Sequence, residues 1–179
     1  MFYLFLADGF EETEALATLD VMRRAGMEVL TVGVTGEYVT GSHNVTVKSD
    51  INVDDIDLTA AEGAVLPGGM PGTRNLEASD AVIDCVKFCY ENKLPVCAIC
   101  AAPSVLGHLG MLKGRTATCF PGFESELEGA NHTGAAVETD GNVITARGAG
   151  CAIAFGHAIV SLVKGREAAD KVTATMQCL

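Results

Sequence analysis

Residues 98–103 place a cysteine where an apolar run meets the start of a predicted helix. Small residues surround Cys100, so a strand would turn into a helix with almost no loop. Tight, strained turns of this kind lift a side chain above a sheet, as in the nucleophile elbow. The positive end of the helix dipole and the unpaired backbone N–H groups favour a thiolate. The pattern predicts a reactive thiol at Cys100, with a small buried core cysteine as the alternative.

A second candidate segment, residues 8–15, carries carboxylates at the start of another predicted helix. For Glu11 and Glu12 we expect N-terminal capping, since negative charge is favoured at that end of a helix. Glu14 is followed by the apolar pair Ala15 and Leu16, a spacing that points its side chain inward over the sheet. A carboxyl that faces a thiolate would have its pKa raised by desolvation and by the like charge. Once protonated, Glu14 could donate a hydrogen bond to the sulfur and act as a general acid or base.

A third segment, residues 66–72, is rich in glycine and proline and follows a further apolar run. Glycines permit a turn whose backbone N–H groups point into a cleft. Together with the N–H of Ala101, such donors could stabilise an oxyanion. An ordinary Pro-Gly turn is the alternative, and the motif by itself does not decide between the two.

Alternating hydrophobic patterns indicate the elements that position these segments. The expected strands are residues 2–7, 28–34, 63–66, 95–99, 116–118 and 143–146, with a small hairpin at 38–40 and 44–48. The expected helices are residues 12–25, 79–92 with Ser79 as N-cap, 102–109, 151–163 and 166–176. This alternation predicts an α/β fold with a mostly parallel sheet and helices on both faces. Ligands of such folds bind at the carboxyl ends of the strands, where all three segments begin.

Composition and charge limit the classes of function. The chain has 179 residues, of which 49% are hydrophobic and 20% charged, so we expect one globular domain over residues 1–179. The net charge is -11 and the basic residues do not cluster, which argues against nucleic-acid binding. Residues 2–7 form a short strand without a basic leader, so no membrane association is expected. The 7 cysteines, an odd number, indicate reduced thiols and a cytoplasmic location.

The three segments, together with residues 20–26 and 145–150, resemble the ThiJ/PfpI superfamily over essentially the whole chain. The similarity is greatest to the branch of the parkinsonism-associated protein DJ-one and its bacterial relatives. This resemblance implies a flavodoxin-like three-layer sandwich that forms a homodimer and needs no cofactor or metal. It assigns the nucleophile to Cys100, its glutamate partner to Glu14, and the oxyanion N–H groups to Gly69 and Ala101. Further candidate pocket positions in this sequence are Gly68, Cys119, Phe120 and Arg147.

The resemblance implies two classes of function. The first is a glutathione-independent glyoxalase or deglycase that acts on methylglyoxal, glyoxal or glycated adducts, with Cys100 attacking the carbonyl. The second is a redox-sensing or chaperone-type stress protein in which Cys100 is oxidised to a sulfinic acid. Formation of lactate from methylglyoxal without added thiol would separate the two.

The sequence departs from the family pattern at three positions. The hydrolase branch has a histidine directly after the cysteine, and here that position is Ala101, so peptidase activity is not expected. Where the parkinsonism-associated relative has a histidine before a proline near the active site, Phe120 precedes Pro121. Where that relative has an arginine in the hairpin region, His43 stands in this chain.

The remaining cysteines have structural and functional interpretations. Cys97 and Cys100 have the spacing of a redox pair, but a thioredoxin-type pair needs both thiols near a helix N-terminus. Cys85 and Cys89 share one helical face, and packing is favoured because no second ligand pair for zinc accompanies them. Cys119 is either a second thiol near the pocket or core filler.

Overall fold

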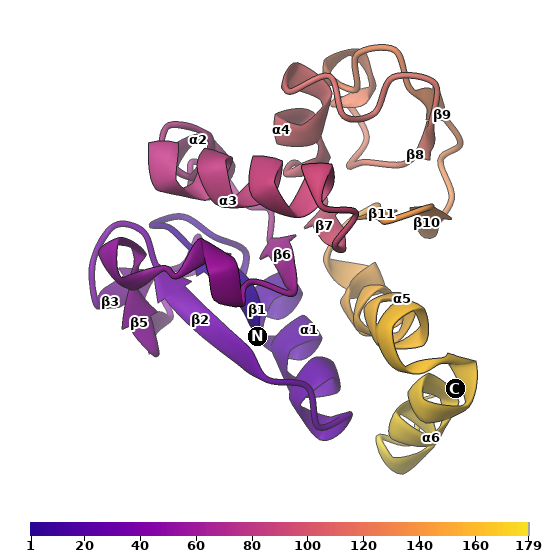
Figure 1. Cartoon of the computed structure of the whole chain (residues 1–179), viewed down its shortest axis with the longest axis horizontal. Helices are drawn as coiled ribbons and strands as arrows, with labels where there is room; N and C mark the ends of the chain where they lie inside the picture. The colour runs from indigo at the N-terminus through magenta and orange to yellow at the C-terminus, as the bar shows by residue number, and fades with distance from the viewer. Residues whose placement is uncertain (179) are drawn as a thin grey trace.

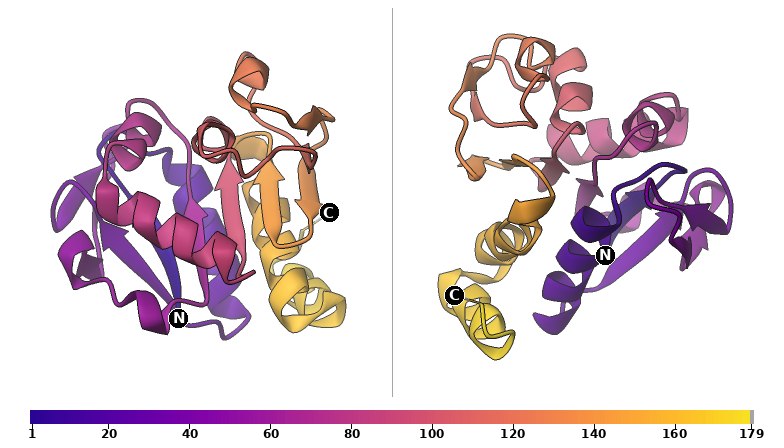
Figure 2. Two further views of the ribbon diagram at one scale, coloured as in Figure 1. Left: turned by 45° about the horizontal axis from the view of Figure 1, so that its top comes forward. Right: turned by 180° about the vertical axis from the view of Figure 1, so that it is seen from behind.

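The computed structural model describes residues 1–178 and has a seven-stranded sheet in the order β10-β11-β7-β6-β1-β2-β5 (Figures 1 and 2). Neighbouring strands are parallel except for β10, which runs antiparallel to β11 at one edge. The strands of this sheet are β1 (Phe2–Leu6), β2 (Val29–Gly33), β5 (Ile51–Asn52), β6 (Gly63–Leu66), β7 (Val96–Ile99), β10 (Val137–Asp140) and β11 (Val143–Ala146). Two small sheets pair β3 (Tyr38–Thr40) with β4 (Thr46–Lys48), and β8 (Thr116–Ala117) with β9 (Asn131–His132). Leu179, the last residue of the predicted domain, lies outside the described residues.

Helices cover both faces of the sheet. One layer contains α1 (Glu12–Arg24), α5 (Ala152–Lys164) and α6 (Arg166–Thr175), and the other contains α2 (Gly72–Glu77), α3 (Asp80–Glu91) and α4 (Pro103–His108) (Figure 1). Short 3-10 turns lie at η1 (Val53–Asp55), η2 (Leu58–Ala60), η3 (Glu124–Glu126) and η4 (Ala149–Cys151). The expected α/β flavodoxin-like arrangement is therefore confirmed. None of the helices in the described part of the chain is both long and apolar enough to cross a bilayer.

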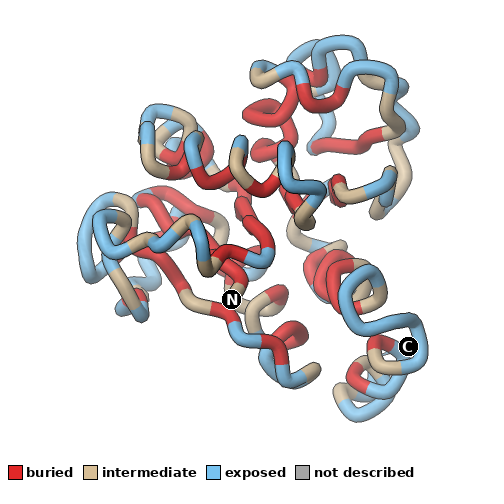
Figure 3. The backbone as a smooth tube through the Cα atoms, in the orientation of Figure 1, coloured by how far each residue is buried: buried red, intermediate tan, exposed pale blue. Residues whose placement is uncertain are grey.

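Two apolar cores, one on each face of the sheet, hold these layers together. All five residues of β1 are buried, because this central strand is covered on both sides (Figure 3). Phe5 faces the core under α3 and α4, whereas Leu4 faces the core under α1 and α5. The period-2 alternation of a strand explains this division.

The strand order changes direction at β1, and this position defines the site. The chain leaves β1 through α1 to reach β2 on one side, and it later adds β6, β7 and β11 on the other side. Since β1, β6 and β7 are adjacent and parallel, their carboxyl ends meet at one edge. Ligands of doubly wound sheets bind at such a switch point.

Several sequence predictions need correction. The helix at residues 72–77 was not expected, and neither were the edge strands β5 and β10. The strand predicted at residues 116–118 pairs with β9 and does not join the main sheet. Ser79 occupies the N-cap position of α3, but its side chain makes no capping hydrogen bond.

Candidate active site

Cys100 lies at the abrupt turn between β7 and α4. Its backbone has a φ of 66°, in the left-handed region that costs a non-glycine residue about 1–2 kcal/mol. Hydrogen bonds on both sides hold this conformation: the Cys100 N–H donates to the Ala146 carbonyl at 2.8 Å, and the Cys100 carbonyl accepts from the Phe120 N–H at 2.8 Å. The strained strand-to-helix turn expected from the sequence is present, and it leaves the cysteine half-buried.

Glu14 enters the site from the first turn of α1, and its side chain is 1% exposed. Its Oε2 accepts a hydrogen bond from the Gly68 N–H at 2.8 Å. Its Oε1 is buried and has no hydrogen-bond partner among the described residues. The carboxyl interacts with the Cys100 thiol. A buried carboxyl oxygen without a partner is costly when it is ionised, so this geometry favours a proton on Glu14 or on the group it meets.

Burial raises the pKa of Glu14 to about 7, against the opposing effects of the neighbouring Cys100 thiol and of the hydrogen bond from the Gly68 N–H. The nearby negative charge of Glu11 raises the pKa further. Glu11 is held there because it caps α1, its Oε2 accepting from the Glu14 N–H at 2.7 Å. The carboxyl therefore gains or loses its proton near neutral pH, where a general acid or base is most effective.

The thiol of Cys100 also has a raised pKa. Burial, followed by the charge and hydrogen bond of Glu14, raises the pKa of Cys100 to about 12, although the backbone N–H groups of Ala101 and Gly69 act in the opposite direction. The expected effect of the helix N-terminus and its free backbone N–H groups, which favour a thiolate, is therefore outweighed by burial and by Glu14. Because both members of the pair have raised pKa values, they retain a proton together at neutral pH. Negative charge on the sulfur requires this proton to lie on Glu14.

The backbone N–H groups of Gly69 and Ala101 lower the pKa of the Cys100 thiol, which places both near its sulfur. Gly69 has a φ of 91°, and a Cβ there would lie 2.5 Å from the Gly9 carbonyl oxygen. Only glycine fits both the backbone conformation and this close approach. These two donors therefore favour negative charge on the sulfur.

Gly68, in the loop that follows β6, contacts both Cys100 and Glu14. A Cβ on Gly68 would lie 2.7 Å from the Cys100 Cβ and 2.7 Å from Glu14 Oε2. The missing side chain therefore allows the loop N–H to reach the carboxylate.

We expect Gly68→Ala to destabilise the fold by about 1–3 kcal/mol, because neither contact can move without disturbing the turn at Cys100. Denaturant unfolding measures this change. Gly150→Ala is a matched control, since a Cβ at Gly150 has no atom within 4 Å, and surface changes of this kind shift stability by roughly 0.5 kcal/mol or less. Equal unfolding midpoints for the two variants would show that a Cβ at residue 68 fits beside Cys100 and Glu14 without destabilising the fold.

Phe120 also lies close to Cys100. Its N–H bonds the Cys100 carbonyl, and its half-exposed ring lies against Gly148, where a Cβ would be 3.3 Å from the ring. Phe120 is therefore an exposed apolar side chain whose backbone is joined to the turn at Cys100.

Two other predicted pocket residues have different surroundings. Cys119 is buried in the core beneath α3 and α4, and burial raises the pKa of its thiol to about 11. Arg147 is exposed and donates to the Gly134 carbonyl at 3.2 Å. We assign Cys119 to packing, and the described contacts of Arg147 are with the Gly134 loop rather than with Cys100.

The spacing of Cys97 and Cys100 does not produce a redox pair. Both are free thiols, and Cys97 is completely buried within β7, where burial raises its pKa. Cys85 and Cys89 are buried in α3 and pack in the core, as expected.

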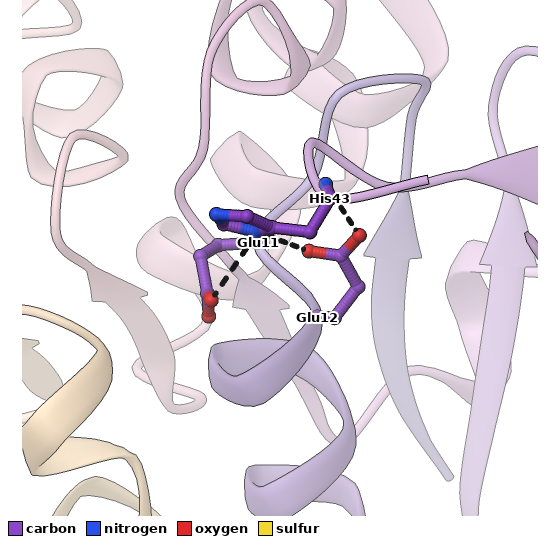
Figure 4. Close-up of side chains that lie close together, drawn as sticks. All are labelled: Glu11, Glu12 and His43. Carbon is purple, nitrogen blue, oxygen red and sulfur yellow. Dashed lines mark hydrogen bonds and ion pairs between the residues drawn. The ribbon is translucent and has the colours of Figure 1, made fainter. Parts of the chain in front are cut away.

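The sequence did not indicate the role of Glu12, which lies next to Glu11 and His43 (Figure 4). Instead of capping α1, Glu12 accepts from the His43 N–H at 2.7 Å and contacts His43 Nδ1 at 2.9 Å. The His43 imidazole lowers the pKa of this carboxyl to about 2, together with backbone donors and against the effect of burial. Three potential metal-ligand atoms lie within 4.8 Å of one another, yet the Glu12 oxygens are already used to fasten the β3–β4 hairpin to α1. We assign this cluster a structural role.

Comparison with known proteins places these features in context. A model of the DJ-1/PfpI family matches residues 2–162. The Parkinson disease protein 7 homolog of Danio rerio is 38% identical over 178 residues, which are 97% of this chain and 94% of that protein. Protein DJ-1 homolog B of Arabidopsis thaliana is 37% identical over 90% of this chain, but the chain spans only 37% of that protein's length.

A protein named deglycase from Thermococcus kodakarensis is 31% identical over 160 residues, which are 88% of this chain and 96% of that protein. Among solved structures, oxidized DJ-1 of Toxoplasma gondii superposes with a TM-score of 0.94 at 29% identity, covering 98% of this chain and 96% of that one.

Proposed function

Because this chain belongs to the DJ-1/PfpI family, we propose that it is a cysteine-dependent glyoxalase or deglycase acting on reactive carbonyls such as methylglyoxal and glyoxal. The observation that carries this proposal is the buried carboxyl of Glu14, which has an unpartnered Oε1 and interacts with the half-buried Cys100 thiol. A nucleophile and an acid–base group in contact are what carbonyl addition followed by proton transfer requires. The deglycase-named relative supports the same class of chemistry.

The proposed reaction starts when the Cys100 proton passes to Glu14 and the sulfur attacks the aldehyde carbon of methylglyoxal. Glu14 then gives this proton to the aldehyde oxygen, so the hemithioacetal carries a hydroxyl and Glu14 is a carboxylate again. Glu14 next removes the hydrogen of that carbon, the hydroxyl proton moves to the neighbouring ketone oxygen, and Glu14 returns its proton to the neighbouring carbon, which gives a 2-hydroxy thioester. Water hydrolyses the thioester to lactate and restores the thiol, so the overall change is the addition of one water. The N–H groups of Gly69 and Ala101 stabilise charge during the addition.

Deglycation would use the same groups on a carbonyl that has already added to an amine or thiol. The Cys100 sulfur forms a bond to the former aldehyde carbon, the bond from that carbon to the amine or thiol breaks, and the leaving amine or thiol takes a proton from Glu14. The steps that follow are the same, so one assay panel of free and adduct-bound carbonyls covers both activities.

We expect the purified protein to convert methylglyoxal to lactate without added thiol, with kcat/KM rising as the pH passes about 7. Below that pH both Glu14 and Cys100 hold a proton, so the sulfur is neutral and unreactive. Above it the pair has lost one proton, and the state with charge on sulfur and the proton on Glu14 becomes available. Enzymatic lactate determination across pH 5–9 measures the profile. No lactate above background at any pH would refute the glyoxalase proposal.

Oxidation of Cys100 is a second candidate function, favoured by the two N–H groups near its sulfur. Peroxide would convert the thiolate to a sulfenic acid and then to a sulfinate, whose oxygens can accept these hydrogen bonds. Intact-mass measurement during peroxide titration tests this proposal. A first oxidation at a cysteine other than Cys100 would count against it.

A further inference from the structure

A crevice of about 180 Å³ lies next to the candidate site, between α2, α4 and the loop that contains η3. It adjoins the site because Met70 follows Gly69, and because Ser104 Oγ donates to the Ala101 carbonyl at 2.7 Å. Most of its other lining residues are polar, and they include Arg74, Glu77, His108 and Glu126. The charged side chains of this crevice have no part in the reaction proposed above.

His108, the last residue of α4, bridges two carboxylates in this crevice. Its Nδ1 lies 2.5 Å from Glu77 Oε1 and its Nε2 lies 2.8 Å from Glu126 Oε2. A neutral imidazole has one N–H, so two carboxylate acceptors are both satisfied only by the imidazolium form. The side chains of Glu77, and then of Glu126, raise the pKa of His108. The bridge therefore consists of one cation between two anions.

The three segments joined by His108 all begin at the candidate site. Glu77 ends α2, which follows the glycine loop bearing the Gly69 N–H. His108 ends α4, which follows Cys100. Glu126 ends η3, which lies in the loop that begins at Phe120. One side chain thus joins the far ends of the three segments that contain Cys100, Gly69 and Phe120.

The η3 loop is attached to α4 at two points. Its first attachment is the bond from the Phe120 N–H to the Cys100 carbonyl. Its second is at Gly107, where a Cβ would overlap the Glu126 carbonyl oxygen and lie 2.9 Å from the Leu127 Cα. Because the loop backbone rests directly on α4 at Gly107, the neighbouring bridge from His108 to Glu126 fixes the loop at the position of closest approach.

We propose that His108 is a positioning residue: its imidazolium, bridging Glu77 and Glu126, holds the loop from Phe120 to Leu127 against α4 and so sets the access to Cys100. The other charged side chain lining the crevice is that of Arg74, on α2. A histidine with a raised pKa stabilises the closed arrangement fully below its ordinary pKa of about 6.5. That contribution is lost as the pH rises through the raised value. Access to Cys100 should therefore increase in alkaline solution.

The test uses carbamidomethylation of Cys100 by iodoacetamide, located by peptide mass spectrometry, in the whole protein between pH 6 and 9.5. At pH 6 we expect His108→Gln to react roughly fivefold faster than wild type, because two ion pairs that hold the loop are lost. The ratio of the two rates should fall towards one as the wild-type His108 loses its proton. Dividing the rates cancels the ionisation of the thiol itself.

His157→Gln is the matched control, because His157 lies on α5 and pairs with Asp170 at 2.7 Å, outside the crevice. The alkylation rate of His157→Gln, divided by that of wild type, should stay at one from pH 6 to 9.5. Glu126→Gln frees the loop while leaving the pair of His108 and Glu77, and should reproduce the effect even if His108→Gln folds poorly. A ratio of one at every pH for Glu126→Gln and for a folded His108→Gln overturns the proposal. A raised rate ratio that does not change with pH also overturns the proposal, because the positive charge of His108 would then not be what holds the loop against α4.

The catalytic consequence rests on the proposed function, whereas the alkylation assay does not. With methylglyoxal as substrate, loss of the bridge should raise KM more than it lowers kcat, since His108 touches none of the reacting groups. If the alkylation ratios behave as expected and no variant forms lactate, the proposed function fails and the positioning role stands.

Discussion

Cys100→Ala should abolish the conversion of methylglyoxal to lactate, with a loss on the order of 10³-fold or more in kcat/KM. The sulfur is the atom that would form the covalent bond to the aldehyde carbon. Cys97 is fully buried and Cys119 packs in the core, so neither can reach a carbonyl held between Glu14 and the N–H groups. The assay is lactate formation in the absence of thiol, at pH 8, where the wild-type profile has passed its rise.

Cys178→Ala provides the matched control, because Cys178 is an exposed free thiol near the end of the described chain. It should retain wild-type turnover. Thermal unfolding separates a chemical effect from a structural one, since alanine leaves the hydrogen bonds of the backbone at residue 100 in place. Retention of lactate formation by a folded Cys100→Ala variant would show that the reaction does not pass through this sulfur.

The positions that follow buried strands were predictable from the sequence because that information is local. Apolar runs marked β1, β6 and β7, and the residue types after them placed Glu14, the glycine loop and Cys100 at one edge of a parallel sheet. Even the strained conformation at Cys100 was indicated, since a strand met a helix with almost no loop between them. The family resemblance added residue roles to an arrangement that the pattern had already outlined.

Contacts between distant residues were not predictable in the same way. Glu12 has the sequence context of a capping residue, yet it binds the hairpin around His43, 31 positions away. His108 meets Glu77 and Glu126 only because α2 and η3 pack on either side of α4. No local pattern marks such partners, because each depends on how two elements pack in three dimensions.

The protonation of the Glu14–Cys100 pair illustrates why electrostatics required the structure. A helix N-terminus by itself lowers the pKa of a cysteine. Here burial and the facing carboxylate outweigh that effect and raise the pKa to about 12. The sequence indicated which groups would meet, but the sign of the thiol shift depends on how deeply both are buried.

Glu14→Gln should lower turnover by about 10²–10⁴-fold while making Cys100 easier to alkylate at neutral pH. Gly68 donates to Oε2, so we expect the glutamine carbonyl oxygen to accept that bond and the NH₂ group, in place of Oε1, to be free to donate to the Cys100 sulfur. This amide donates a hydrogen bond to a thiolate and carries no negative charge, so the pKa of Cys100 should fall. It cannot accept the proton that must move between the two substrate carbons, so the reaction stops after addition.

The rate of iodoacetamide reaction against pH gives the thiol pKa, and lactate formation gives turnover, so the two halves of this prediction are measured separately. Glu28→Gln is the control, because Glu28 is an exposed carboxylate outside the site and should change neither quantity. A merely structural role for Glu14 would disturb both measurements in the same direction, since a displaced turn makes a poorer nucleophile and a poorer catalyst. A more reactive thiol in a protein that no longer turns over is expected only if Glu14 both suppresses the charge on sulfur and carries the proton.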